Sequence, residues 1–326
     1  MTRVADLASF PLCLALAACG AVSPAGPDGG GDPPGAGYVT FTDGPTVYRI
    51  AAHAGAAPED VSALVGAGGG VSERRLNLSP AGAAYVFETG DLGCATVTCV
   101  AVAPVADPTA VELVVPGGVV LDAAEGRSAV TDDGALVVFA AGGGPHQRDL
   151  FVTRRQAGAW TASQLLTERS PHAWQDTPSL SADGARVLFD CGPTANAGPG
   201  GSICEVGVDG GDVAVVVSPA DAPAAIASAG PVHHATFDGE DVVFEAAWDG
   251  ERVWRTGPGG LRPVGSAAND NTPCALADGR IASLYLGRPG NPDGRHELKL
   301  MAADGRELAL LVIGRDLVDE GIGCGG

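Results

Sequence analysis

Six charged or imidazole side chains occupy comparable positions, each at the start of a predicted inner strand, and they are the candidates for a ligand site. They are Arg75, Arg127, Asp176, His233, Asp270 and Asp319. Carboxylate, guanidinium and imidazole groups that meet at one rim could hold a small ligand or a cation. For Asp176 and Asp270 a second interpretation stays open, in which each carboxylate accepts hydrogen bonds from its own turn.

Short catalytic motifs are absent from the sequence. It has no GxSxG nucleophile elbow, no GxxxxGKS/T phosphate loop and no HExxH zinc motif. The glycine-rich segment 65–70 lacks the full dinucleotide fingerprint and its βαβ setting, so it predicts a loop. Because no CxxC or HxxxH pair supplies closely spaced ligands, we expect no metal ion and no cofactor.

Two adjacent histidines, His233 and His234, lie on a predicted inner strand. Successive side chains of a regular strand point to opposite faces, so we expect that the two imidazoles cannot share a metal ion. One of them could face the mouth of a channel. A packed or solvated imidazole is the alternative to a ligand role for either residue.

A recurring phrase predicts the elements that position these residues. It is a polar turn that ends in Gly, followed by an apolar run that reaches Phe, or Leu in the last copy, five residues later. The copies cover residues 79–87, 131–139, 181–189, 237–244 and 277–284. Such repetition indicates one supersecondary unit that is stacked several times.

Each unit is predicted to contain four strands. In the third unit they cover 177–181, 185–190, 202–206 and 213–217, from the inner to the outer position. A sixth unit is split between the chain ends, because 38–42 and 46–50 supply its second and third strands while 319–324 supplies its inner strand. This arrangement closes the ring and removes free sheet edges. The sequence therefore predicts an all-β, six-bladed propeller of four-stranded blades over residues 38–326.

The repeat resembles that of the TolB-like β-propeller family, which reads approximately Pro-x-x-Ser-x-Asp-Gly followed by an apolar strand ending in Phe. Segment 178–189 matches this pattern almost fully, and 273–284 follows it with Leu in place of Phe. The first copy has Pro-Ala-Gly for the turn, the second lacks the Pro, and the fourth has Phe237 before its Asp-Gly. The resemblance implies the fold and, in the family namesake, contacts with envelope lipoproteins and membrane-linked translocation components. It indicates no particular activity, because propellers host many functions.

The charge of the chain excludes one class of partner. Its 326 residues include 19 basic and 39 acidic side chains, for a formal net charge of −20, and Lys299 is the only lysine. Nucleic-acid binders need clustered Lys and Arg, so we expect no nucleic-acid partner. The 49 Gly and 24 Pro residues suit many short strands joined by turns better than they suit a helical protein.

The N-terminal segment predicts an export signal and a tether. Residues 1–18 carry one positive charge before a short apolar run, as is typical of a signal peptide. The run ends in Leu-Ala-Ala-Cys19-Gly20, which resembles the bacterial lipobox and implies a lipid on Cys19, with Gly20 favouring the outer membrane. The Gly- and Pro-rich segment 19–37 predicts a flexible tether. An ordinary secretory signal, in which Cys19 has no role, is the alternative.

Six cysteines remain once Cys13 in the signal peptide and Cys19 are set aside. An even number in an exported chain indicates disulfides. Spacing favours the pairs Cys94–Cys99, Cys191–Cys204 and Cys274–Cys324. The first two pairs would staple hairpin loops, and the third would lock the seam of the ring. Zinc binding is the competing explanation, but it requires closely spaced ligand pairs that the chain lacks.

Together these patterns predict a non-catalytic binding or scaffolding propeller that a lipid anchors in the cell envelope. We expect a monomer whose partners are envelope proteins or a small ligand, with no membrane contact beyond the anchor. The alternative is an envelope enzyme, of the polysaccharide lyase or hydrolase type, with its site at the channel mouth. Carboxylates and imidazoles gathered around a metal at the rim would favour that enzyme. A structural display module at the cell surface is the third hypothesis.

Overall fold

Antiparallel sheet is the main regular structure of the protein, whose structure is a computed structural model. It describes residues 37–44, 46–65, 76–90, 92–118, 123, 127–194, 200–226, 228–248, 250–265, 269–286, 296–315, 317 and 322–326. All of these belong to the compact unit Pro33–Gly326. The predicted signal peptide, Cys19, the tether up to residue 36, Arg75 and Asp319 lie outside the described residues. Within the described ranges, no helix has the length and apolar character needed to cross a membrane.

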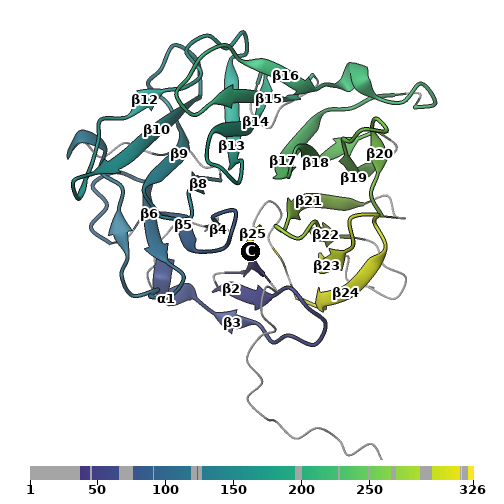
Figure 1. Ribbon diagram of the computed structural model, residues 1–326, viewed down its shortest axis with the longest axis horizontal. Helices are drawn as coiled ribbons and strands as arrows, with labels where there is room; N and C mark the ends of the chain where they lie inside the picture. The colour runs from purple at the N-terminus through teal and green to yellow at the C-terminus, as the bar shows by residue number, and fades with distance from the viewer. Residues whose placement is uncertain are drawn as a thin grey trace, which may run out of the picture. The chain divides into compact units, whose positions relative to one another are not determined.

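Six sheets form the blades of a β-propeller around a central axis, which confirms the predicted fold (Figure 1). Blade 1 runs from the inner to the outer position through β25 (Gly323–Gly325), β1 (Tyr38–Asp43), β2 (Thr46–Ala51) and β3 (Glu59–Asp60). Blade 2 contains β4 (Asn77–Leu78), β5 (Ala84–Thr89), β6 (Cys99–Pro104) and β7 (Glu112–Leu113). Blade 3 contains β8 (Ala129–Val130), β9 (Leu136–Ala141), β10 (Asp149–Gln156), β11 (Ala159–Trp160) and β12 (Gln164–Leu165).

The other three blades have four strands each. Blade 4 contains β13 (Trp174–Leu180), β14 (Arg186–Gly192), β15 (Ser202–Gly207) and β16 (Ala214–Val217). Blade 5 contains β17 (Val232–Asp238), β18 (Asp241–Ala247), β19 (Glu251–Arg255) and β20 (Arg262–Pro263). Blade 6 contains β21 (Asp270–Ala275), β22 (Ile281–Tyr285), β23 (Glu297–Met301) and β24 (Glu307–Val312). Short helical turns at α1 (Ser62–Val65), η1 (Pro116–Gly118) and η3 (Pro219–Asp221) lie in the connections.

Blade 3 departs from the predicted four strands, because two short strands share its outer position. A tight turn at Ala157 and Gly158, with φ of 50° and 81°, brings β11 against the end of β10. The Thr161 N–H donates to Arg154 O at 2.8 Å, but the Thr161 hydroxyl accepts the N–H of Arg154 at 3.1 Å, so a side chain replaces one bond of the ladder. β12 resumes the pairing at Val152 and Phe151. The outer strand is thus interrupted by a local side-chain bond.

The polar part of the repeat builds the turn between the first and second strands of a blade. In blade 4, Gly184 has φ of 68° and donates its N–H to Ser181 O at 2.8 Å. Asp183 Oδ1 accepts both the Ser181 hydroxyl at 2.6 Å and the Ala185 N–H at 3.0 Å. Because Gly adopts a left-handed φ without steric cost, the Ser-x-Asp-Gly sequence encodes this turn directly.

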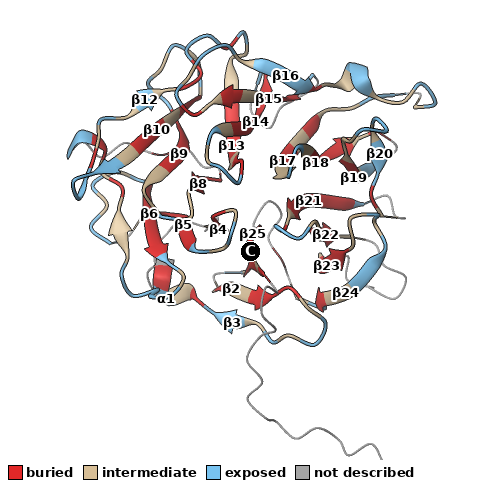
Figure 2. Ribbon diagram, viewed as in Figure 1, coloured by how far each residue is buried: buried red, intermediate tan, exposed pale blue. Residues whose placement is uncertain are grey.

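The apolar part of the repeat supplies the core between neighbouring blades. Its final residues are at most 2% exposed; they are Phe41, Phe87, Phe139, Phe189, Phe244 and Leu284. Phe189 of blade 4, for example, belongs to the same buried cluster as Val138 and Leu150 of blade 3. Figure 2 shows that burial decreases outward, with the outer strands β3 and β16 largely exposed. Blade-to-blade packing is therefore what the repeated Phe stabilises.

The C-terminal strand closes the ring. β25 pairs with β1 in the antiparallel register Val39 to Cys324, and Cys324 forms a disulfide with Cys274 of blade 6. The N–H of Gly326 donates to Pro80 O of blade 2 at 3.0 Å, and its carbonyl oxygen accepts the N–H of Ala277 in blade 6 at 3.0 Å. The seam thus joins three blades, and the predicted closure is confirmed.

The two faces of the ring differ in their connections. Since the strands of a blade are antiparallel, the start of each inner strand lies beside the end of the second strand, as Asp176 lies opposite Asp190 and His233 opposite Glu245. We call the side on which these residues lie the mouth face. It carries the connections between second and third strands and those between blades. The repeated tight turns lie on the opposite face.

Candidate functional site

A cavity of about 180 Å³ lies along the axis between the inner strands. All six inner strands contribute to its lining, through residues that include Asn77, Arg127, Thr177, Thr236, Cys274 and Cys324. A water molecule occupies about 30 Å³ of liquid, so this space holds a few waters or a small ion. A larger ligand would have to bind outside this cavity.

Two imidazoles and one carboxylate converge at the mouth end of blade 5. His233 Nε2 lies 3.4 Å from Glu245 Oε1, and His234 Nδ1 lies 3.1 Å from Glu245 Oε2. The side chains of His234 and Glu245 are buried, whereas that of His233 is 23% exposed. One potential ligand atom from each residue lies within 4.8 Å of the others. This donor set is suited to a divalent metal ion.

A β-bulge explains why adjacent histidines meet, and it corrects the expectation that they point to opposite faces. The register of β17 against β18 shifts between His233 and Thr236, and His234 has φ of 54°. A bulge inserts an extra residue and re-aims a side chain. The two rings consequently lie on one side, with their centroids 4.5 Å apart. The prediction was wrong because it assumed a regular strand.

Buried acids tie these bulges to the neighbouring blades. Glu245 Oε2 accepts the backbone N–H of Thr272 in blade 6 at 2.8 Å. In the same manner, Asp190 Oδ1 of blade 4 accepts the N–H of His234 at 2.9 Å. Thr272 also has a positive φ, of 45°, at a register shift in its own strand. Both of these bulges therefore aim an N–H at the acid of the preceding blade.

The two acids have opposite pKa shifts. Burial opposes ionisation of Glu245, but the hydrogen bond with His234, the charges of both histidines and the Thr272 N–H together lower its pKa. Burial raises the pKa of Asp190 to about 7, with the nearby carboxylate of Asp176 adding to the rise and His234 opposing it. Glu245 is therefore the ionised partner for a cation, and Asp190 titrates near neutral pH.

The predicted rim residues are only partly brought together. Arg127 is buried and borders the cavity, and His233 belongs to the cluster described above. Asp176 forms an ion pair with Arg148 and accepts the Thr177 N–H at 2.8 Å. Asp270 is fully buried beside Lys299, inside blade 6 rather than at the rim. The carboxylates of Asp176 and Asp270 are thus engaged locally, and a ligand role for the rim residues stays a prediction.

Two solved structures are similar to this chain over most of its length. TolB from Acinetobacter baumannii aligns with a TM-score of 0.60 at 12% identity, covering 88% of this chain and 66% of that one. The putative TolB from Agrobacterium tumefaciens aligns with a TM-score of 0.54 at 14% identity, covering 86% and 91%. The chain is a TolB-like six-bladed β-propeller in fold. No protein-family model matches the sequence, and no curated protein matches it either.

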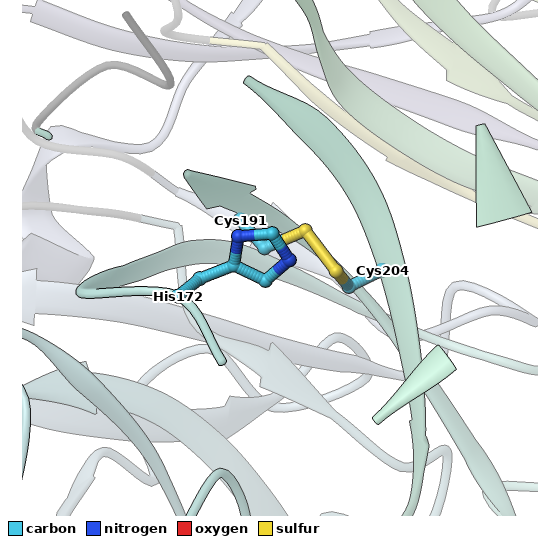
Figure 3. Close-up of side chains that lie close together, drawn as sticks. All are labelled: His172, Cys191 and Cys204. Atoms are coloured by element: carbon cyan, nitrogen blue, oxygen red, sulfur yellow. A yellow bond between two sulfur atoms is a disulfide. The ribbon is translucent and has the colours of Figure 1, made fainter. Parts of the chain in front are cut away.

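The described part of this TolB-like propeller contains the three predicted disulfides. They are Cys94–Cys99, Cys191–Cys204 and Cys274–Cys324. Figure 3 shows the imidazole of His172 beside the bond between Cys191 and Cys204. Because both sulfurs are in a disulfide, this group offers no thiolate to a metal ion. Burial lowers the pKa of His172, consistent with a neutral packed imidazole.

The sequence analysis missed the two acids that organise the mouth of the TolB-like propeller, Asp190 and Glu245. Each directly follows the Phe of its repeat, and Glu88 occupies the same position after Phe87. All three are buried. A charged residue that recurs at the same position of a buried apolar strand indicates a partner inside the protein, since unpaired buried charges are costly. That signal was present in three copies of the repeat.

Proposed function

We propose that this protein is a non-catalytic binding propeller that presents its mouth face to a protein partner in the bacterial cell envelope. The observation that carries this proposal is an exposed apolar loop on that face. Between β5 and β6, Val97 is 77% exposed and Leu92 42% exposed, and the Cys94–Cys99 disulfide constrains the loop. A constrained loop with apolar side chains suits protein recognition, because little conformational entropy is lost on binding.

The TolB-like fold supports a protein-binding role, since the resemblance implies a propeller that contacts envelope proteins. The proposal further includes a lipid on Cys19, a tether over 19–37 and location at the outer membrane. Three disulfides support an oxidising compartment outside the cytoplasm. Two or more acyl chains on one residue anchor a protein stably, so Cys19 alone would suffice as the anchor.

Crosslinking in intact cells followed by affinity capture tests this role. Val97→Asp places a charge on the proposed surface, and Val215→Asp, on the exposed outer strand β16, is the matched control. We expect the same crosslinked protein with wild type and Val215→Asp, and at least a tenfold lower yield with Val97→Asp. Equal yields with both variants would exclude the loop as the contact surface.

The second candidate is an envelope enzyme with its site at the mouth, and the His233–His234–Glu245 cluster favours it. Such an enzyme would use the cluster to hold a metal ion, or Glu245 as a base. Turnover of a polysaccharide or peptide library by the purified protein, abolished by Glu245→Gln, would support this candidate. A captured partner without turnover supports the binding propeller instead.

A further inference from the structure

We propose that His233, His234 and Glu245 form a binding site for one first-row divalent metal ion, with Zn²⁺ the best match. The proposal is independent of the protein partner inferred above. It rests on the positions of three side chains and on the backbone that fixes them. The sequence offered no recognisable metal motif, since two of the ligands are adjacent and the third lies on the next strand.

The separations of the donor atoms fit a shared ion. Two ligands that each lie about 2.0–2.1 Å from one Zn²⁺ are about 2.9–3.4 Å apart in tetrahedral or octahedral geometry. The two imidazole nitrogens lie 3.1 and 3.4 Å from the oxygens of Glu245. All three potential ligand atoms fall within 4.8 Å of one another. His233 contacts Oε1 and His234 contacts Oε2, so a shared ion would replace these contacts through adjustment of the side chains.

The backbone holds the three ligands in place before any ion binds. The positive φ of His234 directs its ring to the side of His233, and the Asp190 carboxylate fixes the His234 N–H at 2.9 Å. The Thr272 N–H donates to Glu245 Oε2 at 2.8 Å and orients that carboxylate. Hydrogen bonds of this kind around a metal site set the orientation of the ligands. The site thus receives support from three consecutive blades.

The donor set selects the class of metal. Two imidazoles with one carboxylate suit Zn²⁺ and its first-row neighbours, whereas Ca²⁺ and Mg²⁺ prefer oxygen ligands alone. Three protein ligands leave a fourth position of a tetrahedral ion for water or another ligand. The side chain of His233 is 23% exposed, so a ligand from solvent can reach that position. The bound ion would consequently face the mouth.

Metal titration of the tag-free, disulfide-intact protein tests the site. After removal of metals with a chelator and dialysis, Zn²⁺ is titrated by calorimetry, with Mg²⁺ and Ca²⁺ as comparisons. We expect one Zn²⁺ per chain and no measurable heat from the other two ions. Substitution with Co²⁺ should give the visible absorption of a tetrahedral nitrogen- and oxygen-ligated ion. Absence of stoichiometric Zn²⁺ binding by the folded wild type would overturn the proposal.

Variants assign the bound ion to these residues. His233→Ala, His234→Ala and Glu245→Gln should each weaken Zn²⁺ binding by about tenfold or more. His172→Ala, which removes an imidazole beside a disulfide, is the control and should keep full affinity. Glu245→Gln retains an oxygen for the Thr272 N–H, so its fold can be verified by circular dichroism. Unchanged affinity in the His233 and Glu245 variants would place the ion elsewhere and refute this site.

Discussion

The backbone N–H of His234 donates a hydrogen bond to Asp190 Oδ1 across 2.9 Å, which joins the bulge of blade 5 to the second strand of blade 4. The Thr272 N–H and Glu245 repeat the arrangement between blades 6 and 5. The bulges are therefore more than local distortions of the inner strands. They connect neighbouring blades at the mouth end, where the apolar packing of the repeated Phe residues gives way to polar groups.

Stability should depend on pH through Asp190. Its pKa is about 7 in the folded protein, mainly because of burial, and 3.8 is the ordinary value. An acid whose folded pKa is raised contributes stability that is fully present below about pH 4 and is lost as the pH rises through about 7. Asp190→Asn cannot ionise and keeps an oxygen for the His234 N–H. We expect this variant to gain up to about 4 kcal/mol relative to wild type between pH 4 and 8.

Urea unfolding of chelator-treated protein from pH 3 to 8 measures this difference. Asp183→Asn provides a control, because the stability contribution of Asp183 should change with pH in the opposite direction. The Ser181 hydroxyl and the Ala185 N–H lower the pKa of Asp183, so its contribution is present above the ordinary pKa and is lost as the pH falls. Asp183→Asn should therefore lower the free energy of unfolding more at pH 7 than at pH 3. If the two variants showed the same pH trend, the assignment of Asp190 as the neutral-pH group would be wrong.

Much of the fold was predictable because each residue of the repeated motif has a local physical role. Gly184 requires a left-handed φ, Asp183 satisfies the turn, and Phe189 fills the space between blades. The closure was predictable for the same reason, since the N-terminal unit lacked one strand and the C-terminus supplied it. Periodic burial and turn chemistry are properties of short segments, so they can be recognised in the sequence without knowledge of the whole structure.

The candidate site was less predictable, because it depends on departures from regular strands. The φ of His234 follows from a bulge, and the position of Glu245 follows from the register that this bulge sets. Asp270 looks equivalent to Asp176 in the sequence, yet a buried lysine holds it inside its blade. Contacts across blades decide these placements. A single repeat read alone carries no information about them.

Removal of the seam disulfide Cys274–Cys324 should destabilise the ring more than removal of the loop disulfide Cys94–Cys99. Cys274 and Cys324 are 50 residues apart, whereas Cys94 and Cys99 are 5 apart. On the loop-entropy model, the losses are about 4 and about 2 kcal/mol. The double variants Cys274→Ser/Cys324→Ser and Cys94→Ser/Cys99→Ser can be compared by urea unfolding. Equal losses would show that the seam crosslink stabilises the ring no more than the Cys94–Cys99 crosslink does.

Gly325 should tolerate no side chain. A Cβ at this position would lie 2.1 Å from Ser79 O and 2.8 Å from Gly82 N, both backbone atoms of blade 2. We expect Gly325→Ala to cost about 1–3 kcal/mol, since overpacking at a rigid contact forces the strands apart. At Gly142 a Cβ would meet nothing within 4 Å, so Gly142→Ala is the control and should change thermal stability little. A neutral Gly325→Ala would mean that β25 is not held against blade 2 in solution.

Membrane attachment should depend on Cys19 and not on Cys13. Lipidation of the Cys19 sulfur is the proposed anchor, and Cys13 lies within the apolar run of the signal peptide, where its thiol has no proposed role. In fractionated cells, Cys19→Ser should move the protein from the membrane pellet to the soluble fraction. Cys13→Ser, which makes the same chemical change six residues earlier, should leave it in the pellet. Globomycin, which inhibits the lipoprotein signal peptidase, should cause the uncleaved precursor of wild type to accumulate and should leave the processing of Cys19→Ser unchanged. Retention of Cys19→Ser in the pellet after removal of its signal peptide would refute lipid anchoring.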